Sequence, residues 1–483
     1  MTRTPARRLL PVLLLVVLGI FALRDFARLG EALPWRAMDD FPDFYCAGSA
    51  LDQGASPYTY EPLHTCEHRV NAGATFRGRL FAANPALAIP APQPPYDFPP
   101  YMLLARAPFA DARTVQAIAI VAAVTGAVWG LAALGVPWSV AAAVLLLSTL
   151  YASLRTGQIV PFALLALVAC GLCFARRRDA WGGFFAALTA IEPALGLAVA
   201  VATLIFVPRA RAPLLAALAL LGCVAVAVSG PLGAVDYLMR VLPAHAASEV
   251  YFPFQYSFTY AAAWLGASAD AARIAGILCY FLLLGAGLWL GSAAADRMKR
   301  RELLVFLPAL CAVLGGSFVH QEELCFALPA LAILSLQTRG WPRTISIAAL
   351  CVVALPWIAV WGTKQLFAAS LFVCALTLWR LRVELRIAVP IFVAIAAALY
   401  GFELHPPKLP VPSGSALPVI APGDLAGHAW QAYTAQRGTH GVAWLAVKLP
   451  VWAALIAAIV AAAAAGQRGA AEGATPASIS RRI

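Results

Sequence analysis

Apolar runs of roughly 16–25 residues, long enough to cross a bilayer as helices, recur along almost the whole chain. Because a lipid core offers no partner for free backbone groups, such runs must fold as helices whose hydrogen bonds are internal. Hydrophobic residues make up 62% of the 483 residues and charged residues 12%, and the mean hydropathy is +0.79. These values exclude an ordinary soluble domain. The sequence therefore predicts an all-α, polytopic membrane protein, with residues 1–483 forming one integral membrane domain.

Basic residues gather in the short gaps between these runs, as the positive-inside rule expects of cytoplasmic loops. The clusters are Arg176–Arg178, Arg209 with Arg211, Arg297–Arg301, Arg339 with Arg343, Arg380–Arg386, and Arg481–Arg482. This distribution accounts for the net charge of +12 without a nucleic-acid partner. It predicts cytoplasmic termini. The first apolar run lacks a convincing small-residue cleavage site and is interpreted as a retained anchor.

The clusters fix a topology of about twelve crossings. Between two of them, the segment Trp181–Val207 is interrupted by Glu192-Pro193, which predicts a re-entrant pair of short helices. External loops then fall at 24–111, 230–271 and 402–445, and the third is rich in proline and predicted to be extended. The crossings are expected at Leu9–Leu23, Thr114–Leu134, Trp138–Ser153, Ile159–Phe174, Leu214–Ser229, Ala272–Leu290, Leu303–Phe318, Leu324–Leu336, Ile345–Trp361, Leu366–Trp379, Ile387–Tyr400 and Ala446–Ala465.

Cysteine spacing gives two different expectations. Cys170 and Cys173 form a CxxC inside an apolar run, where they are interpreted as small buried hydrophobic residues. Cys46 and Cys66 both lie in the first external loop, so a disulfide between them is one possibility in an oxidising compartment. No phosphate-binding loop and no metal motif is present in the sequence, and no metal or cofactor is expected.

Three carboxylates lie just beyond the first apolar run, in Asp39-Asp40-Phe41-Pro42-Asp43. Acidic groups at a membrane boundary are costly to desolvate, so the cluster needs a reason. One reason is a solvated or capping turn; the other is a catalytic base that faces a membrane-embedded substrate. The following residues, Phe44–Leu51, are expected to form a short amphipathic helix.

Four short motifs follow one another in the first part of the chain: Asp40-Phe41-x-x-Phe44-Tyr45-x-Ala47-Gly48 with Gly54 and Tyr58, then Tyr96-Asp97-Phe98-Pro99-Pro100, Gly157-Gln158 and Gln255-Tyr256-Ser257. In their order they resemble the motifs of glycosyltransferase family 87, the last one more loosely. Members of this family are GT-C-type transferases that use polyprenyl-phosphate sugars. The resemblance covers about the first 340 residues. Two departures stand out: Val160 where the family usually has Asn, and Glu192-Pro193 where it commonly has Lys-Pro.

The resemblance implies an inverting transferase that moves a hexose, mannose as the first expectation, from a polyprenyl-phosphate sugar to an extracytoplasmic glycolipid or glycan. The acceptor hydroxyl needs a general base within hydrogen-bond reach. The motif match makes Asp40 the first choice and Asp43 the second. Such an enzyme is expected in a bacterial plasma (inner) membrane, with its active site on the external face.

The remaining candidate substrate-binding residues follow from the motifs and from their place at predicted helix ends. His320 matches a boundary His of the family, and Arg155 is suited to a lipid phosphate; a solvated cap and a snorkelling side chain are the respective alternatives. Glu192 is expected at membrane depth, as a functional or a hydrogen-bonded structural group. The full set is His320, Arg155, Gln158, Tyr45, Tyr58, Asp97, Glu192 and Ser257.

A transporter or lipid flippase is the alternative from another class. It predicts paired charges along a path near the membrane midplane, and the sequence offers few there beyond Glu192. No repeat with matching broken helices occurs in the two halves of the chain. The placement of the carboxylates therefore favours the enzyme.

Overall fold

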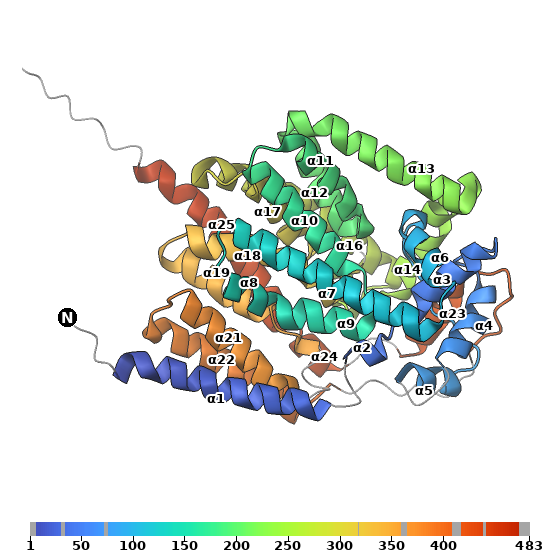
Figure 1. Cartoon of the computed structure of the whole chain (residues 1–483), viewed down its shortest axis with the longest axis horizontal. Coiled ribbons are helices and arrows are strands. Elements are labelled where there is room, and N and C mark those ends of the chain that lie inside the picture. The colour runs from blue at the N-terminus through green and yellow to red at the C-terminus, as the bar shows by residue number, and fades with distance from the viewer. Residues whose placement is uncertain are drawn as a thin grey trace, which may run out of the picture.

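The computed structural model describes residues 6–29, 34–71, 76–316, 318–358, 365–407, 417–437 and 441–472 (Figure 1). Within these ranges the regular elements are helices, with two isolated bridges and no strand. The helices of the main bundle include α1 (Ala6–Leu29), α7 (Phe109–Ala133), α8 (Trp138–Leu145), α10 (Val160–Ala175), α12 (Pro193–Phe206), α13 (Arg211–Asp236), α16 (Ala269–Met298), α19 (Gly340–Val353), α21 (Gln365–Arg380), α22 (Leu385–Leu404) and α25 (Leu449–Glu472). The predicted all-α class is confirmed.

The two ends of the bundle differ in kind. At one end, which we call the basic face, the predicted basic clusters meet: Arg300 donates from Nη2 to the carbonyl oxygen of Leu134 at 2.7 Å, and Arg343 donates to that of Leu381 at 2.7 Å. The opposite end, the loop face, lies at the right in Figure 1 and is built from short helices. These are α2 (Pro34–Ala37), α3 (Phe41–Asp52), α4 (Tyr60–Val70), α5 (Phe76–Ala83), α6 (Pro99–Leu104), α14 (Leu242–Ser248), α15 (Phe258–Trp264), α23 (Ala426–Arg437) and α24 (Val442–Ala446).

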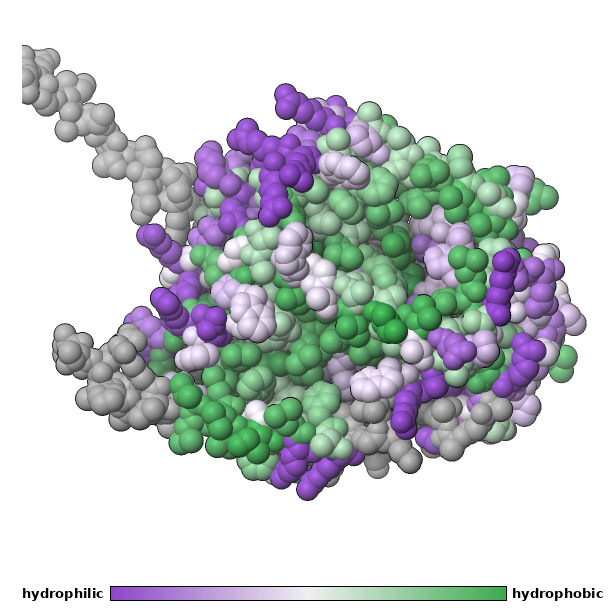
Figure 2. Space-filling view, viewed as in Figure 1, coloured by the Kyte–Doolittle hydropathy of each residue, from purple (hydrophilic) through white to green (hydrophobic). Residues whose placement is uncertain are grey.

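Six stretches of helix are long and apolar enough to cross a membrane. They are Phe109–Ala133, Trp138–Thr156, Pro208–Ser248, Ala269–Met298, Leu385–Leu404 and Val442–Ala465. Hydrophobic residues occupy the middle of the surface in Figure 2, and most hydrophilic residues lie toward its two ends. This arrangement supports a membrane protein with a bilayer around its middle. Five further apolar helices have 10–17 residues, so the count of twelve crossings stays a prediction.

Two short helices, α11 (Asp179–Leu188) and α12, form the predicted pair that enters from the basic face and returns to it. At the start of α11, Asp179 forms an ion pair with Arg301 at 3.0 Å. Near the end of α12, Nε of Arg211 donates to the carbonyl oxygen of Leu204 at 2.7 Å. With 10 and 14 residues the helices are about 15 and 21 Å long, less than the ~30 Å of a hydrocarbon core. The turn between them is at Glu192, directly before Pro193.

The predicted external segments contain most of the short helices. The helix expected at Phe44–Leu51 is α3, which starts earlier, at Phe41, and is buried along almost its whole length. A disulfide joins Cys46 of α3 to Cys66 of α4, and Cys170 and Cys173 are free. Segment 230–271 begins with a kink at Gly230 inside α13 and contains α14 and α15. In segment 402–445, residues 408–416 and 438–440 lie outside the described residues, as do part of the proline-rich stretch and the cluster Arg481–Arg482.

Helix α16 packs directly against α17 (Leu303–Ala312), and small residues make this close contact possible. A Cβ atom placed on Gly287 of α16 would lie 2.7 Å from Cα of Pro308 and 3.0 Å from Cβ of Cys311. The nearest of these atoms, Cα of Pro308, belongs to the backbone and cannot move aside by a side-chain rotation. The absence of a side chain at Gly287 therefore lets the two helices touch.

We expect Gly287→Ala to lower the free energy of unfolding by roughly 1–3 kcal/mol, because the added methyl group overpacks the interface. Thermal unfolding of the purified protein in detergent measures the effect. Gly285→Ala on the same helix is the control, since nothing lies within 4 Å of a Cβ atom there. Equal losses of stability in the two variants would contradict the proposed tight contact.

Candidate active site

The acidic loop is fixed to the end of α9 (Ala152–Thr156) by its backbone. The N–H of Asp39 donates to the carbonyl of Arg155 at 2.9 Å, and the N–H of Asp40 donates to that of Thr156 at 2.7 Å. These bonds satisfy carbonyls that the helix end leaves free. The loop therefore has a defined position at the loop face.

Gly157 explains why the end of α9 and the acidic loop approach each other so closely. Its φ of +83° is the left-handed conformation that ends α9, and a Cβ atom there would lie only 2.6 Å from Cβ of Phe41. Only glycine meets both demands without strain. The turn directs the next residue, Gln158, toward the acidic loop.

The carboxylate of Asp40 is held by two donors and remains partly exposed. Nε2 of Gln158 donates to its Oδ2 at 2.8 Å, and Nη1 of Arg77 donates to its Oδ1 at 3.1 Å. One third of the Asp40 side chain, 33%, is exposed. The structure therefore joins two residues that the sequence singled out, Asp40 and Gln158, in one contact.

Arg77 of α5 is a site residue that sequence reasoning missed. Its side chain is only 5% exposed, and it donates to the backbone carbonyl of Asp39 and to the carboxylates of Asp40 and Asp43. Burial alone would lower the pKa of Arg77, but the surrounding carboxylates raise it, so the guanidinium is charged. The guanidinium of Arg77 thus contacts all three acidic residues of the loop and fixes their relative positions.

Asp43 faces inward. Burial raises the pKa of the Asp43 carboxyl to about 8, although Arg77 opposes the shift. Burial, together with the charge of Asp43, also raises the pKa of the neighbouring Glu67 well above its usual value. Two buried carboxyl groups beside one guanidinium are most stable when they share one proton. Asp43 is therefore placed to position Arg77, whereas Asp40 is the carboxylate that meets the exterior.

A second polar group centres on His320, which precedes η7 (Glu322–Ala327). Its Nε2 lies 3.1 Å from Oε2 of Glu249, and its backbone N–H donates to Glu323 at 2.8 Å. Nε1 of Trp430 in α23 donates to the other oxygen of Glu249 at 2.8 Å. Glu249 and Trp430, neither of which the sequence pattern marked, therefore orient His320.

His320 is a cation in this setting. Burial by itself would lower its pKa, but the hydrogen bond and charge of Glu249, with Glu323 and Glu322 adding to them, raise the pKa to about 10. The side chain is 24% exposed, so the charged ring is partly open to a ligand. A fixed cation of this kind suits an anionic group.

The half-buried polar side chains of the loop face form one cluster. Glu322 lies within electrostatic range of Asp40, Arg155 and His320. Glu192, at the turn between α11 and α12, lies within range of Asp97, His320 and Glu322. We call this set the polar cluster; its members are Asp40, Asp97, Arg155, Gln158, Glu192, His320 and Glu322, and each is half-buried.

Arg155 and Asp97 have hydrogen-bonding capacity that the described part of the chain leaves unused. Within the described ranges, the side chain of Arg155 makes no hydrogen bond or ion pair, although it lies within range of the carboxylates of Asp39 and Glu322. Oδ2 of Asp97 is buried without a hydrogen bond, and burial raises the pKa of this carboxyl well above its usual value. Both have hydrogen-bonding capacity that a substrate could use.

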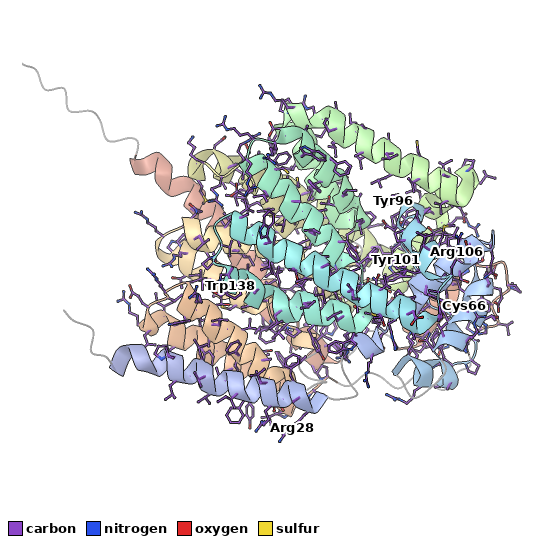
Figure 3. The ribbon with its side chains drawn as sticks, viewed as in Figure 1. Arg28, Cys66, Tyr96, Tyr101, Arg106 and Trp138 are labelled. Carbon is purple, nitrogen blue, oxygen red and sulfur yellow. A yellow bond between two sulfur atoms is a disulfide. The ribbon has the colours of Figure 1, made fainter. Side chains whose placement is uncertain are left out.

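Three predicted substrate-binding residues have their hydroxyl groups occupied. Tyr45 donates to the carbonyl of Ala107 at 2.9 Å, and Tyr58 donates to that of Gln93 at 2.8 Å. The buried Ser257 donates to the side chain of Gln255. These three side chains shape the walls of the loop face. Figure 3 shows nearby Tyr96 and Tyr101 at the same end of the molecule as Arg106 and Cys66.

No model of a known protein family matches this chain, and no curated protein matches it. Among the described residues, no three His, Cys, Asp or Glu side chains are arranged to hold a metal ion. The chemistry of the site is therefore interpreted from the polar cluster itself.

We expect Glu249→Gln to reduce stability by roughly 1.5–3 kcal/mol at neutral pH, the worth of a hydrogen bond to a charged group. Because the pKa of His320 is raised from 6.5 to about 10, its stabilising effect is full below pH 6.5 and is lost as the pH rises toward 10. Between pH 6.5 and pH 10 the melting temperature of the wild type should therefore fall, whereas that of the Glu249→Gln variant should fall much less.

Melting temperatures measured from pH 6 to pH 10 test this. Glu61→Gln is the control, since it removes the carboxylate of a more exposed pair with His64, 3.2 Å apart. An unchanged pH dependence in Glu249→Gln would show that Glu249 does not hold the charge on His320.

Proposed function

We propose that this protein is an inverting GT-C-type glycosyltransferase. It moves a hexose, with mannose as the first candidate, from a polyprenyl-phosphate sugar to a glycolipid or glycan acceptor in a bacterial cell envelope. The observation that supports this most is the half-exposed carboxylate of Asp40, fixed between Gln158 and Arg77 at the loop face of an apolar bundle. The positive-inside pattern favours an external position for that face.

Asp40 is suited to act as the general base. A base must lie within hydrogen-bond reach of the acceptor hydroxyl and must be ionised before the reaction. Arg77 and Gln158 each stabilise the ionised carboxylate, and they fix both of its oxygens. The exposed third of the side chain leaves room for an acceptor to approach.

His320 and Arg155 are suited to the leaving group. As the sugar departs, negative charge collects on the lipid phosphate, and preorganised cations lower the barrier to this step. His320 is held charged by Glu249, while Arg155 has no side-chain partner in the described part of the chain. Glu322 lies within electrostatic range of both and of Asp40, which links the base to the two cations.

A transporter or lipid flippase is the second candidate, and Glu192 is the observation that favours it. This carboxyl lies at the turn of two short helices within an apolar bundle, where transporters place ion and substrate sites. The charged members of the polar cluster nevertheless gather around the loop face. This arrangement suits a reaction at one membrane surface better than a path across it.

We expect Asp40→Asn to reduce sugar transfer by a factor of roughly 10²–10⁴, because the acceptor loses its base. The assay uses purified protein and a small panel of radiolabelled polyprenyl-phosphate sugars. Asp52→Asn is the matched control: Asp52 ends the same helix, α3, and pairs with the exposed Arg106 at 2.7 Å. An Asp40→Asn variant that keeps both its fold and its activity would remove Asp40 from the mechanism.

We expect Arg155→Gln to raise the KM for the lipid donor roughly 10- to 100-fold, the loss of a charge-assisted hydrogen bond to phosphate. Arg155→Lys should recover part of this, since it restores the charge but not the two-pronged geometry. Arg106→Gln is the control for lost surface charge. If no donor supports transfer and the protein instead moves labelled lipid across liposomes, the transporter assignment replaces the enzyme.

A further inference from the structure

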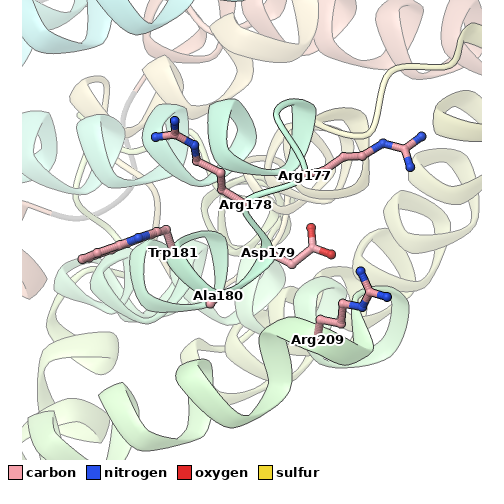
Figure 4. Close-up of a pocket in the computed structure, with 6 residues that line it drawn as sticks. All are labelled: Arg177, Arg178, Asp179, Ala180, Trp181 and Arg209. Carbon is pink, nitrogen blue, oxygen red and sulfur yellow. The ribbon is translucent and has the colours of Figure 1, made fainter.

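A hollow of about 460 Å³ opens on the basic face, at the end of the bundle opposite the polar cluster. Figure 4 shows arginine side chains from two segments around the first turn of α11, with Trp181 extending to one side. The lining residues are Arg177, Arg178, Asp179, Ala180, Trp181 and Arg209.

The backbone builds this hollow in two steps. Arg177 has a left-handed conformation, with φ of +57°, which reverses the chain after α10 and brings Arg178 to the start of α11. On the other side, α11 packs directly on η5 (Pro208–Ala210): a Cβ atom on Gly183 would lie 2.3 Å from the carbonyl oxygen of Ala210. That contact places Arg209 beside the same helix end.

Some arginines of the basic face are hydrogen-bonded within the protein, and others have no partner among the described residues. Elsewhere on this face, Arg211, Arg300, Arg301 and Arg343 all donate to carbonyl oxygens. Arg177, Arg178 and Arg209 make no hydrogen bond or ion pair with any residue that the structure describes. The one carboxylate in the lining, Asp179, is already neutralised by Arg301 at 3.0 Å. The hollow is therefore strongly positive.

We infer that the hollow binds a phosphate group, carried by the headgroup of an anionic phospholipid. Arginine guanidinium groups match phosphate oxygens in geometry and charge. Basic hollows between helices at the cytoplasmic side of a membrane recognise such headgroups. Trp181, 60% exposed at the rim, is the residue type favoured at the depth of lipid headgroups, which argues for a lipid rather than a free phosphate ion.

The test titrates the full chain in neutral detergent with dioleoylphosphatidylglycerol, and native mass spectrometry counts the bound lipid. The combined variant Arg177→Gln, Arg178→Gln and Arg209→Gln should bind this lipid at least tenfold more weakly. The control variant Arg297→Gln, Arg339→Gln and Arg382→Gln removes the same charge from exposed positions on this face outside the hollow and should bind as the wild type does. Equal loss in both variants would overturn the proposal.

A second variant keeps the test valid if the first one folds poorly. Ala180→Glu keeps every arginine and places a carboxylate in the hollow, and an acidic residue in the first turn favours the helix. It should also weaken lipid binding at least tenfold, and wild-type affinity in a folded Ala180→Glu variant would contradict the site.

Two further ligands separate the possible sources of phosphate. Zwitterionic dioleoylphosphatidylcholine should not replace the anionic lipid, and a large excess of inorganic phosphate should displace little of it. Calorimetric binding of inorganic phosphate that disappears in the combined variant, with displacement of the lipid, would make the free ion the ligand and overturn the lipid assignment.

Discussion

One buried guanidinium organises the loop face. Arg77 reaches a backbone carbonyl and two carboxylates of the acidic loop, and its own side chain is nearly inaccessible. Without this cation, the buried carboxyl group of Asp43 would have no compensating charge, and breaking a buried pair in this way typically costs about 3–5 kcal/mol. The position of the carboxylate that we assign as the base therefore depends on a residue that faces away from substrate.

The same constraint separates the roles of the two candidate carboxylates. Both contact Arg77, as their spacing along the chain allows, yet one is partly exposed and the other is buried. Burial raises the pKa of Asp43 and of the neighbouring Glu67, which favours a shared proton on this inner pair, while the guanidinium of Arg77 also contacts the outer carboxylate of Asp40. Within the acidic cluster, Asp40 is thus the carboxylate that faces outward, and Asp43 is the buried one that helps to hold Arg77 in place.

The helical class and the pair of short helices at Glu192 could be predicted because they depend on local features: apolar length, a proline after a polar residue, and flanking basic clusters. Contacts between distant segments could not. Arg77 lies 34 residues from Asp43, Glu249 lies 71 residues from His320, and Trp430 lies 181 residues from Glu249. Nothing in the local pattern marks such partners. Tyr45 and Tyr58 show the reverse case: the sequence motif predicts that they bind substrate, and in the structure their hydroxyl groups donate to backbone carbonyls.

The arginines at the two ends of the molecule have different surroundings. Helices α11 and α12 run between these two ends. At the loop face, Arg77 pairs with carboxylates of its own chain, whereas three arginines of the hollow on the basic face make no hydrogen bond or ion pair with the residues that the structure describes. Helix α11 starts at that hollow, and the turn that follows it carries Glu192, within electrostatic range of His320. Because α11 packs on η5 through close backbone contact at Gly183, the same short helix borders the hollow at its start and leads to the turn at Glu192 at its end.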